Sequence, residues 1–252
     1  MLTSIQNERV KLVHALQNQA KTRRKERKIA LEGKRLIQDA LANEHRAEFI
    51  LYDPEFINPM DFDVPKSIMI PAETSVIRHI SDTEQPQGVV AVFPMPSGKL
   101  PTPLTRALIL DNLRDPGNVG TILRTAAAAG IEAVFLSAGS VDAYNPKVLR
   151  SAMGAHFRLV VVEHGWDAIA EYCHDLPVYL ADMTGDVRYD QANWSQYALI
   201  IGSEAHGAST EAQTIANHTV YIPMQENAES LNAAIAAGVM LFEARRAFLK
   251  NS

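Results

Sequence analysis

The sequence has little cysteine and none of the long apolar runs of membrane proteins. Cys173 is the single cysteine among 252 residues, so an internal disulfide and a zinc site built from several thiolates are both excluded. No stretch approaches the roughly 18 consecutive apolar residues of a transmembrane helix. The eight histidines show no HExxH or similar ligand spacing. We therefore expect neither a membrane span nor a bound metal ion.

Two smaller features fit these absences. Cys173 lies in the apolar pattern WDAIAEYC, which favours a buried small side chain over a nucleophile. The N-terminus is polar from Thr3 onward and lacks the apolar core of a secretion signal. We therefore expect a cytoplasmic protein.

Charge is distributed unevenly along a chain of globular composition. Hydrophobic residues make up 47% and charged residues 21%, with a formal net charge of -5, and this composition excludes wholesale disorder. Residues 1–36 carry ten basic and three acidic residues, a net of +7, and the remainder carries -12. This basic N-terminal segment, residues 1–36, is called the basic arm. It indicates a nucleic-acid partner, although the total charge of the chain is negative.

A proline-rich break divides the chain. The segment PMPSGKLPTP (94–103) has four prolines in ten residues, so it is neither helix nor central strand and is the predicted linker. Before it, helical patterns over 10–16 and 29–41 precede short apolar runs, and we predict a small α/β domain over 1–98. The predicted strands are 49–53, 67–70 and 88–93, with a helix at 74–80.

After the break, apolar strands alternate with helices. This alternation predicts a parallel sheet covered on both faces, and thus an α/β domain over 104–252. Ligands bind beyond the carboxyl ends of such strands, which directs attention to the loops after 112, 182, 204 and 224. The predicted strands are 106–112, 133–137, 159–163, 177–182, 197–204 and 218–224, and the predicted helices are 118–129, 146–153, 166–173, 209–216 and 230–249.

The first of these loops, DNLRDPGNVG, leads into a helix rich in alanine. Pro116, Gly117 and Gly120 allow backbone to approach a ligand, and a helix N-terminus offers N–H donors to an anion. An ordinary strand-to-helix connection capped by Asn118 explains the pattern equally well. Arg124 either points to solvent or reaches toward the strand ends.

The second loop, IGSEAHGAS, follows a buried strand. It departs from GxSxG, so a nucleophilic Ser203 is disfavoured. Gly202 instead indicates close approach of backbone to a ligand. His206 fits a solvated loop residue better than a catalytic base.

The third loop, YIPMQENAESLNAAIAAG, precedes the last helix. Ser230 is the predicted N-cap of that helix, whereas Asn232 has no propensity reason to stand in a first helical turn. Glu226 and Asn227 add polar groups at the same strand end. The three loops predict a site for a polar or anionic substrate without naming a reaction. Its candidate residues are Asn112, Asn118, Arg124, Glu204, Ser230 and Asn232.

In this order the three loops resemble the signature motifs of SpoU-type (TrmH-like) RNA 2′-O-ribose methyltransferases of the SPOUT superfamily. Glu226 departs from the pattern, since members commonly have glycine there. The residues that carry the resemblance are Asn112, Arg114, Asn118, Gly120 and Arg124, then Gly202, Glu204 and Gly207, then Ile222, Pro223, Met224, Glu229, Ser230, Leu231 and Asn232.

The N-terminal segment is similar to the substrate-binding domain that precedes the methyltransferase domain in many members. The resemblance therefore implies an RNA substrate-binding domain over 1–98 and a parallel-sheet SPOUT methyltransferase domain over 104–252. It further implies a deep trefoil knot, a homodimer and S-adenosylmethionine as the cofactor. Physics alone would not predict the knot, because threaded chains are nearly absent from known folds.

The resemblance also implies roles for individual residues. Arg124 would stabilise the developing alkoxide or act as a base, and a guanidinium is a poor proton acceptor, which favours stabilisation. The implied catalytic residues are Asn118, Arg124, Glu204, Ser230 and Asn232; cofactor-binding residues are Ala181, Gly202, Ile222, Met224 and Leu231; RNA-binding residues are Arg23, Arg24, Lys25 and Arg114.

Three alternatives stay open at this point. The RNA could be transfer RNA, although the two-domain form favours structured ribosomal RNA. The chain could be a non-catalytic RNA-binding protein that keeps the fold, which Glu226 alone supports. An unrelated nucleotide-dependent α/β enzyme would need a GxGxxG or Walker loop, and the sequence has neither.

Overall fold

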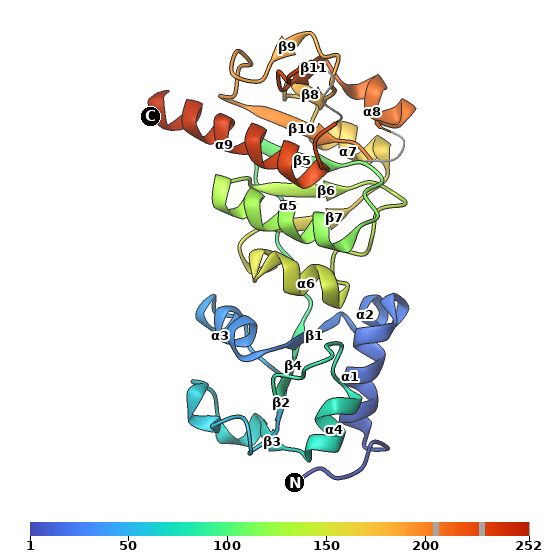
Figure 1. Ribbon diagram of the computed structural model, residues 1–252, viewed down its shortest axis with the longest axis vertical. Coiled ribbons are helices and arrows are strands. Elements are labelled where there is room, and N and C mark those ends of the chain that lie inside the picture. Colours follow the sequence, from blue (N-terminus) through green and yellow to red (C-terminus); the bar gives the residue numbers. More distant parts are fainter. Residues whose placement is uncertain (204–206, 227–229, 252) are drawn as a thin grey trace. The chain divides into compact units, whose positions relative to one another are not determined.

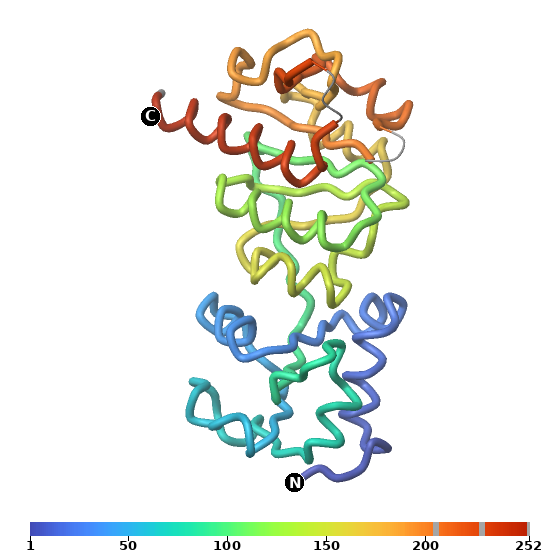
Figure 2. The backbone as a smooth tube through the Cα atoms, in the orientation of Figure 1, coloured from blue at the N-terminus to red at the C-terminus, as the bar shows by residue number. Residues whose placement is uncertain are grey.

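The computed structural model describes residues 1–203, 207–226 and 230–251. The chain forms two compact units, whose elements Figure 1 labels and whose backbone Figure 2 traces. The first unit consists of Met1–Pro96 and Tyr144–Phe157, and the second consists of Ser97–Ala143 and Arg158–Ser252. These units differ from the predicted division into 1–98 and 104–252 in the segment 144–157.

A four-stranded sheet lies at the centre of the first unit, in the order β1-β4-β2-β3. β4 pairs antiparallel with β1 and β2, and β2 pairs parallel with β3. Branched and aromatic side chains, which favour strands, dominate these segments. The strands are β1 (Lys28–Glu32), β2 (Phe49–Tyr52), β3 (Met69–Pro71) and β4 (Val89–Pro94).

Helices cover both faces of this sheet. On one face Val13 of α1 and Ile77 of α4 pack against Val92, and on the other Ile37 of α3 packs in the cluster that contains Phe93. The first unit is therefore a layered α/β fold, as predicted for the N-terminal segment. Its helices are α1 (Glu8–Asn18), α2 (Ala20–Glu26), α3 (Lys34–Ala42) and α4 (Thr74–His79), with 3-10 turns η1 (Pro59–Asp61), η2 (Lys66–Ile68) and η3 (Ala155–Phe157).

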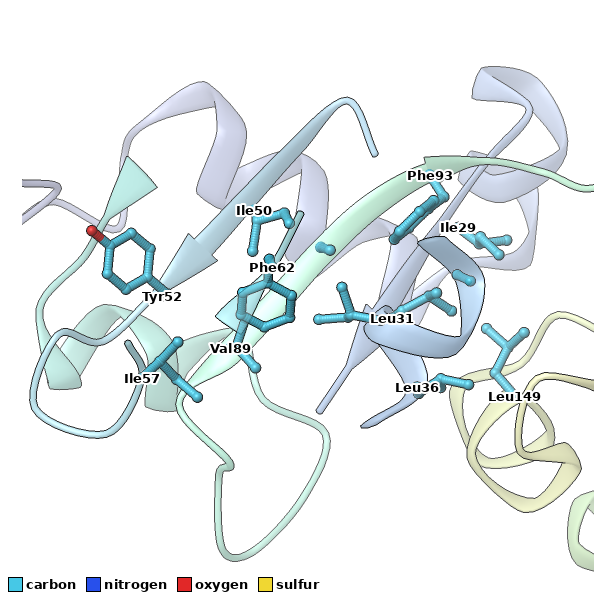
Figure 3. Packing of buried hydrophobic residues seen from close by; sticks show 13 residues of the cluster. Ile29, Leu31, Leu36, Ile50, Tyr52, Ile57, Phe62, Val89, Phe93 and Leu149 are labelled. Carbon is cyan, nitrogen blue, oxygen red and sulfur yellow. The ribbon is translucent and has the colours of Figure 1, made fainter. Parts of the chain in front are cut away.

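A helix from the later part of the sequence completes this core. Leu149 of α6 (Pro146–Ala152) is 3% exposed and belongs to the same apolar cluster as Leu36 of α3, and Figure 3 shows the two side chains close together. Arg150 of α6 forms an ion pair with Asp82 at 2.6 Å. The first unit thus takes part of its core from beyond residue 140.

A seven-stranded sheet forms the centre of the second unit, in the order β7-β6-β5-β10-β8-β11-β9. All its neighbouring pairs are parallel, so the carboxyl ends of the strands lie along one edge. The strands are β5 (Arg106–Leu110), β6 (Ala133–Leu136), β7 (Val160–Glu163), β8 (Val178–Ala181), β9 (Val187–Arg188), β10 (Tyr197–Ile201) and β11 (His218–Tyr221).

Helices also cover this sheet on both faces. On one face Ile169 of α7 and Ala212 of α8 pack with Ile109 and Ile200 of the sheet. On the other, α5 and α9 pack against each other, side by side in Figure 1. The predicted parallel α/β sheet is confirmed. The helices are α5 (Pro116–Ala129), α7 (Trp166–Tyr172), α8 (Thr210–Ile215) and α9 (Ala233–Asn251).

One prediction about an element was wrong. The helical pattern over 29–41 is a strand, β1, followed by α3, and Gly33 at φ 101 separates them. Residues of β1 are buried on both faces, so the alternation that marks a half-exposed strand is missing. The short strand β9 was not predicted.

Candidate functional site

The candidate site lies at the carboxyl edge of the parallel sheet. The loops that follow β5, β8, β10 and β11 meet there, as expected for an α/β sheet. The loops after β8, β10 and β11, together with the start of α9, line a cavity of about 350 Å³ whose lining is mostly apolar. Its lining residues are Ala181, Asp182, Met183, Ile201, Gly202, Ser203, Gly207, Ala208, Ile222, Met224, Ser230, Leu231, Ala233, Ala236 and Met240.

The cavity brings together one of the predicted sets of residues. All five candidates for cofactor binding line it, and so does Ser230. The candidates Asn118, Arg124 and Asn232 are not among the lining residues. Sequence reasoning missed Met183 and Met240, although the loop after residue 182 was marked as informative.

The loop after β10 is tightly folded around Gly202. A Cβ atom at this position would come within 2.9 Å of the backbone nitrogen of Ala208 and of the carbonyl carbon of Gly207. The N–H of Ser203 donates to the carbonyl of Gly207 at 3.0 Å, and the N–H of Gly207 donates back at 2.8 Å. Only glycine fits at position 202, and the missing side chain leaves room beside the cavity.

Helix α5 starts differently from the prediction. Asp115 is its N-cap, and the N–H of Asn118 donates to Oδ1 of Asp115 at 2.7 Å. Pro116 occupies the first helical position, where its missing N–H is harmless. The alternative of a connection capped by Asn118 is therefore ruled out, and the side chain of Asn118 makes a different contact.

That contact joins α5 to the start of α9. Nδ2 of Asn232 donates to Oδ1 of Asn118 at 3.1 Å. Oδ1 of Asn232 accepts from the N–H of Ala234 at 2.9 Å and of Ile235 at 3.3 Å, so Asn232 caps the helix. The prediction that Ser230 is the N-cap was wrong. The cap role of Asn232 also explains why an asparagine stands at the start of this helix.

Arg114 and Arg124, the two arginines of the first motif, are both exposed. Nε of Arg114 donates to Oδ1 of Asn112 at 3.2 Å. Asn112 itself has φ 53 and donates its N–H to the hydroxyl of Ser137 at 3.0 Å. Arg124, on α5, makes no hydrogen bond or ion pair with any residue that the structure describes, which leaves its guanidinium to solvent or to a ligand.

Several residues of the second and third motifs lie outside the described residues. These are Glu204, His206, Asn227 and Glu229. Glu226 is described; it is exposed and does not line the cavity. Its φ is not positive, so the turn does not require the glycine that members of the family commonly carry there.

The predicted RNA contacts of the basic arm divide into two kinds. Arg24 and Lys25 are exposed. Arg23 is only 3% exposed, and its Nη1 donates to the carbonyl of Leu16 at 2.6 Å and of Gln17 at 3.3 Å. The expectation that Arg23 faces RNA therefore needs correction, because its guanidinium is occupied by the last carbonyls of α1.

The remaining titratable groups offer little chemistry. Burial raises the pKa of the Cys173 thiol to about 12, as predicted for a buried small side chain rather than a nucleophile. Among the described residues no cluster of three or more His, Cys, Asp or Glu could hold a metal ion. Within the same ranges, no helix has the length and apolar character needed to cross a membrane.

Two family models match the sequence. One, described as the SpoU rRNA Methylase family, matches residues 105–242. The chain belongs to this SpoU family, and the resemblance drawn from the three motifs is confirmed. A second model, described as an MRM3-like substrate binding domain, matches residues 7–91 of this SpoU methylase.

Individual relatives of this SpoU methylase agree. The 23S rRNA (guanosine(2553)-2′-O)-methyltransferase RlmP of Bacillus subtilis (strain 168) is 33% identical over 247 residues, 97% of this chain and 98% of that protein. The mitochondrial rRNA methyltransferase 3A of Danio rerio is 38% identical over 285 residues, 90% of this chain but 66% of that protein. The SpoU methyltransferase AviRb from Streptomyces viridochromogenes, solved in complex with AdoMet, superposes with a TM-score of 0.86 at 27% identity, covering 96% of this chain and 98% of that one.

Proposed function

We propose that this SpoU methylase transfers a methyl group from S-adenosylmethionine to a ribose 2′-hydroxyl of ribosomal RNA. One observation carries the proposal: a cavity at the carboxyl edge of the sheet is lined by all five residues implied for the cofactor, and they come from three separate segments of the chain. The names of the bacterial and mitochondrial relatives support ribosomal over transfer RNA.

The cavity fits the proposed cofactor in size and chemistry. Its volume of about 350 Å³ lies within the usual range for small-molecule sites. Ala181, Ile222 and Leu231 offer apolar surface to an adenine ring, and Gly202 leaves backbone accessible beside it. When bound, S-adenosylmethionine supplies an electrophilic methyl group.

The chain must then stabilise the hydroxyl oxygen as it loses its proton. Arg124 is suited to hold an RNA phosphate and to stabilise negative charge, since it has no partner among the described residues and a guanidinium does not readily accept a proton. Long helical side chains lean toward the N-terminus, which directs Arg124 toward the turn that carries Asn118. Glu204, Ser230 and Asn232 order the surrounding loops in this proposal.

RNA recruitment is assigned to the N-terminal domain over 1–98 and to Arg114. Arg24 and Lys25 are exposed in the basic arm and can release counterions by contacting phosphates. Arg23 is left out because it is buried. A cytoplasmic location stays a prediction.

A homodimer is part of the proposal. Ile235, Phe242 and Leu249 on α9 are 56%, 51% and 60% exposed. Their spacing of seven residues places them along one side of the helix, and such an apolar stripe favours a covering partner. A second copy of the chain offers the same stripe, as a two-fold interface requires.

The trefoil knot is also proposed rather than observed. β10 lies between β5 and β8, β11 lies beyond β8, and α9 returns to α5. This order is compatible with threading of the C-terminal segment through an earlier loop. Pulling the chain by both ends in a single-molecule experiment would leave a knotted chain shorter than its full contour length.

The function is tested by mapping 2′-O-methylation in total RNA from a deletion strain. We expect one or more ribosomal ribose methyl groups to be missing, and the purified protein with S-adenosylmethionine to restore them. Loss from transfer RNA alone would change the substrate class. If the methylation map is intact and the protein binds RNA but not the cofactor, the chain is a non-catalytic RNA-binding protein.

A further inference from the structure

A buried carboxylate stands beside the site without an assigned role. Asp111 follows the last residue of β5 and is 1% exposed. Oδ1 accepts from the hydroxyl of Ser137 at 3.1 Å, and Oδ2 accepts from the backbone N–H of Ser209 at 2.7 Å. It forms no ion pair with any described residue. Burying a carboxylate without a cation costs free energy. These two hydrogen bonds offset part of that cost and fix the orientation of the side chain.

The bond to Ser209 reaches the far end of the loop after β10. Gly202, Ser203, Gly207 and Ala208 line the cavity, and Ser209 follows them directly. The mutual bonds between Ser203 and Gly207 close the loop on itself, but they do not tie its outgoing end to the sheet. The Asp111 carboxylate makes that connection from the neighbouring strand β5.

The other oxygen of Asp111 is held from a third strand. The hydroxyl of Ser137, which follows β6, donates to Oδ1 of Asp111 and accepts from the N–H of Asn112 at 3.0 Å. Ser137 is itself only 1% exposed. The direction in which Asp111 presents Oδ2 is therefore fixed by groups of the sheet rather than by the loop.

We infer that Asp111 is a positioning residue for the cofactor cavity: its carboxylate holds Ser209 and so places Gly207 and Ala208 against the bound cofactor. The inference rests on the proposed cofactor site. Without the carboxylate the loop keeps its internal closure and the packing of Ala208 against the sheet. It loses the hydrogen bond that fixes the backbone at Ser209, and cofactor affinity falls.

The chain contains a matched control for this residue. Asp53 follows β2 in the first unit and is 2% exposed. It also accepts from one hydroxyl, that of Thr74 at 2.6 Å, and one backbone N–H, that of Glu55 at 2.9 Å. Removing either carboxylate has a similar structural cost, but only Asp111 is bonded to a loop of the cavity.

The experiment measures the Kd of S-adenosylmethionine by calorimetry and the Tm of the full chain. We expect Asp111→Ala to raise Kd about ten-fold, since one charge-assisted hydrogen bond is lost. Asp111→Asn keeps an acceptor for Ser209 and restores affinity to within about two-fold of the wild type. Asp53→Ala lowers Tm and leaves Kd unchanged.

A second pair of variants tests the same bond from its donor side. Ser209 has φ -65, which proline adopts, so Ser209→Pro removes the N–H while keeping the backbone angle. Ser209→Ala keeps the N–H and removes the hydroxyl that caps α8 through Ala212. We expect the proline variant to bind the cofactor about ten-fold more weakly than the alanine variant. This comparison decides the question if Asp111→Ala fails to fold.

Two results overturn the inference: equal Kd values for Ser209→Pro and Ser209→Ala, or a loss of affinity in Asp53→Ala equal to that in Asp111→Ala. Ala236→Leu separates this failure from failure of the cofactor site, because Ala236 lines the cavity and leucine fills part of it. If Ala236→Leu also binds normally, the cavity assignment itself is wrong.

Discussion

Nδ2 of Asn232 donates a hydrogen bond to Oδ1 of Asn118, and this bond joins the start of the last helix to the first turns of α5. The amide of Asn232 can be oriented in only one way, because its Oδ1 accepts the N–H of Ala234. Asn118 must then present Oδ1 to Asn232, which turns its Nδ2 to the other side. The first and third motifs thus form one hydrogen-bonded unit.

The Asn118–Asn232 bond can be removed without loss of the helix cap. Asn232→Asp keeps a good N-cap for α9 but loses the N–H group that donates to Asn118. The amide of Asn118 must then turn over, so that its nitrogen faces residue 232. We expect about a ten-fold lower kcat with unchanged Tm and cofactor Kd. Asn145→Asp makes the same change at the cap of α6 and should leave kcat unaltered. Wild-type turnover by Asn232→Asp would contradict the proposed coupling.

Arg124 is expected to act in the chemical step rather than in cofactor binding. Arg124→Ala should bind S-adenosylmethionine normally and lose about 100- to 1000-fold in methyl transfer, the usual cost of losing one preorganised charge-stabilising donor. Single-turnover assays with radiolabelled cofactor measure this step. Arg158→Ala, a change at an exposed arginine of the same unit, serves as the control. Wild-type turnover by Arg124→Ala would refute the assignment.

The basic arm should separate into RNA-binding and structural residues. The double variant Arg24→Ala/Lys25→Ala should weaken RNA binding and lower the slope of log K against log salt by about two, with unchanged Tm. Arg23→Ala should lower stability by about 2 kcal/mol, since a buried guanidinium loses bonds to the carbonyls of α1, and leave the salt slope unchanged. Filter binding and thermal unfolding measure the two effects. An RNA affinity that does not depend on salt concentration would contradict the proposed role of the basic arm in RNA recruitment.

The apolar stripe on α9 predicts the oligomeric state. Phe242→Asp places a charge at the centre of the stripe and should convert a dimer to a monomer in analytical ultracentrifugation. Phe56→Asp is the matched control, because Phe56 is 64% exposed in the first unit and lies outside the stripe. A wild-type protein that sediments as a monomer would contradict the proposed dimer.

Glu132 should make stability depend on pH. Burial raises the pKa of its carboxyl, but hydrogen bonds from Thr105 and Arg106 and the charge of Arg106 lower it by more, to a net value below the usual 4.5. A lowered folded-state pKa stabilises the fold above the unfolded pKa, and this contribution is lost as pH falls from about 5 toward 3.

The same carboxylate pairs with Arg106 at 2.9 Å. Glu132→Gln should therefore lower the free energy of unfolding at neutral pH by about 1–2 kcal/mol and flatten its decline in acid. Thermal unfolding between pH 7 and pH 3 measures both. Equal acid sensitivity of the variant and the wild type would assign the effect to other groups.

The sequence was sufficient for the parallel sheet but not for strand β1. In the second unit, apolar strands alternate with helices and turn residues mark each boundary, so pattern and fold agree. In β1, Ile29 and Leu31 pack in the cluster that contains α3, and Ala30 packs on the other face in the cluster that contains α1 and α4. A strand covered on both faces has no period of two, and local pattern cannot distinguish it from a buried helix.

The candidate site was predictable at the level of loops and less so at the level of contacts. Ser230 and Asn232 are both good cap residues, and sequence alone favoured the first. Asn232 caps because its amide supplies an acceptor to the helix and a donor to Asn118, which serine cannot do in the same geometry. The burial of Arg23 depends on where α1 ends relative to α2, a tertiary fact that charge counting does not contain.

Helix α6 limits the positions at which recombination can join the sequences of two relatives. Because Leu149 packs in the core of the first unit, a crossover in the proline-rich segment 94–103 would join an N-terminal half to a foreign α6. Exchange of RNA specificity between relatives therefore requires three coordinated crossovers, one in the segment 94–103, one before α6 and one after it. A chimera that carries residues 1–96 and 144–157 from one parent keeps this packing intact.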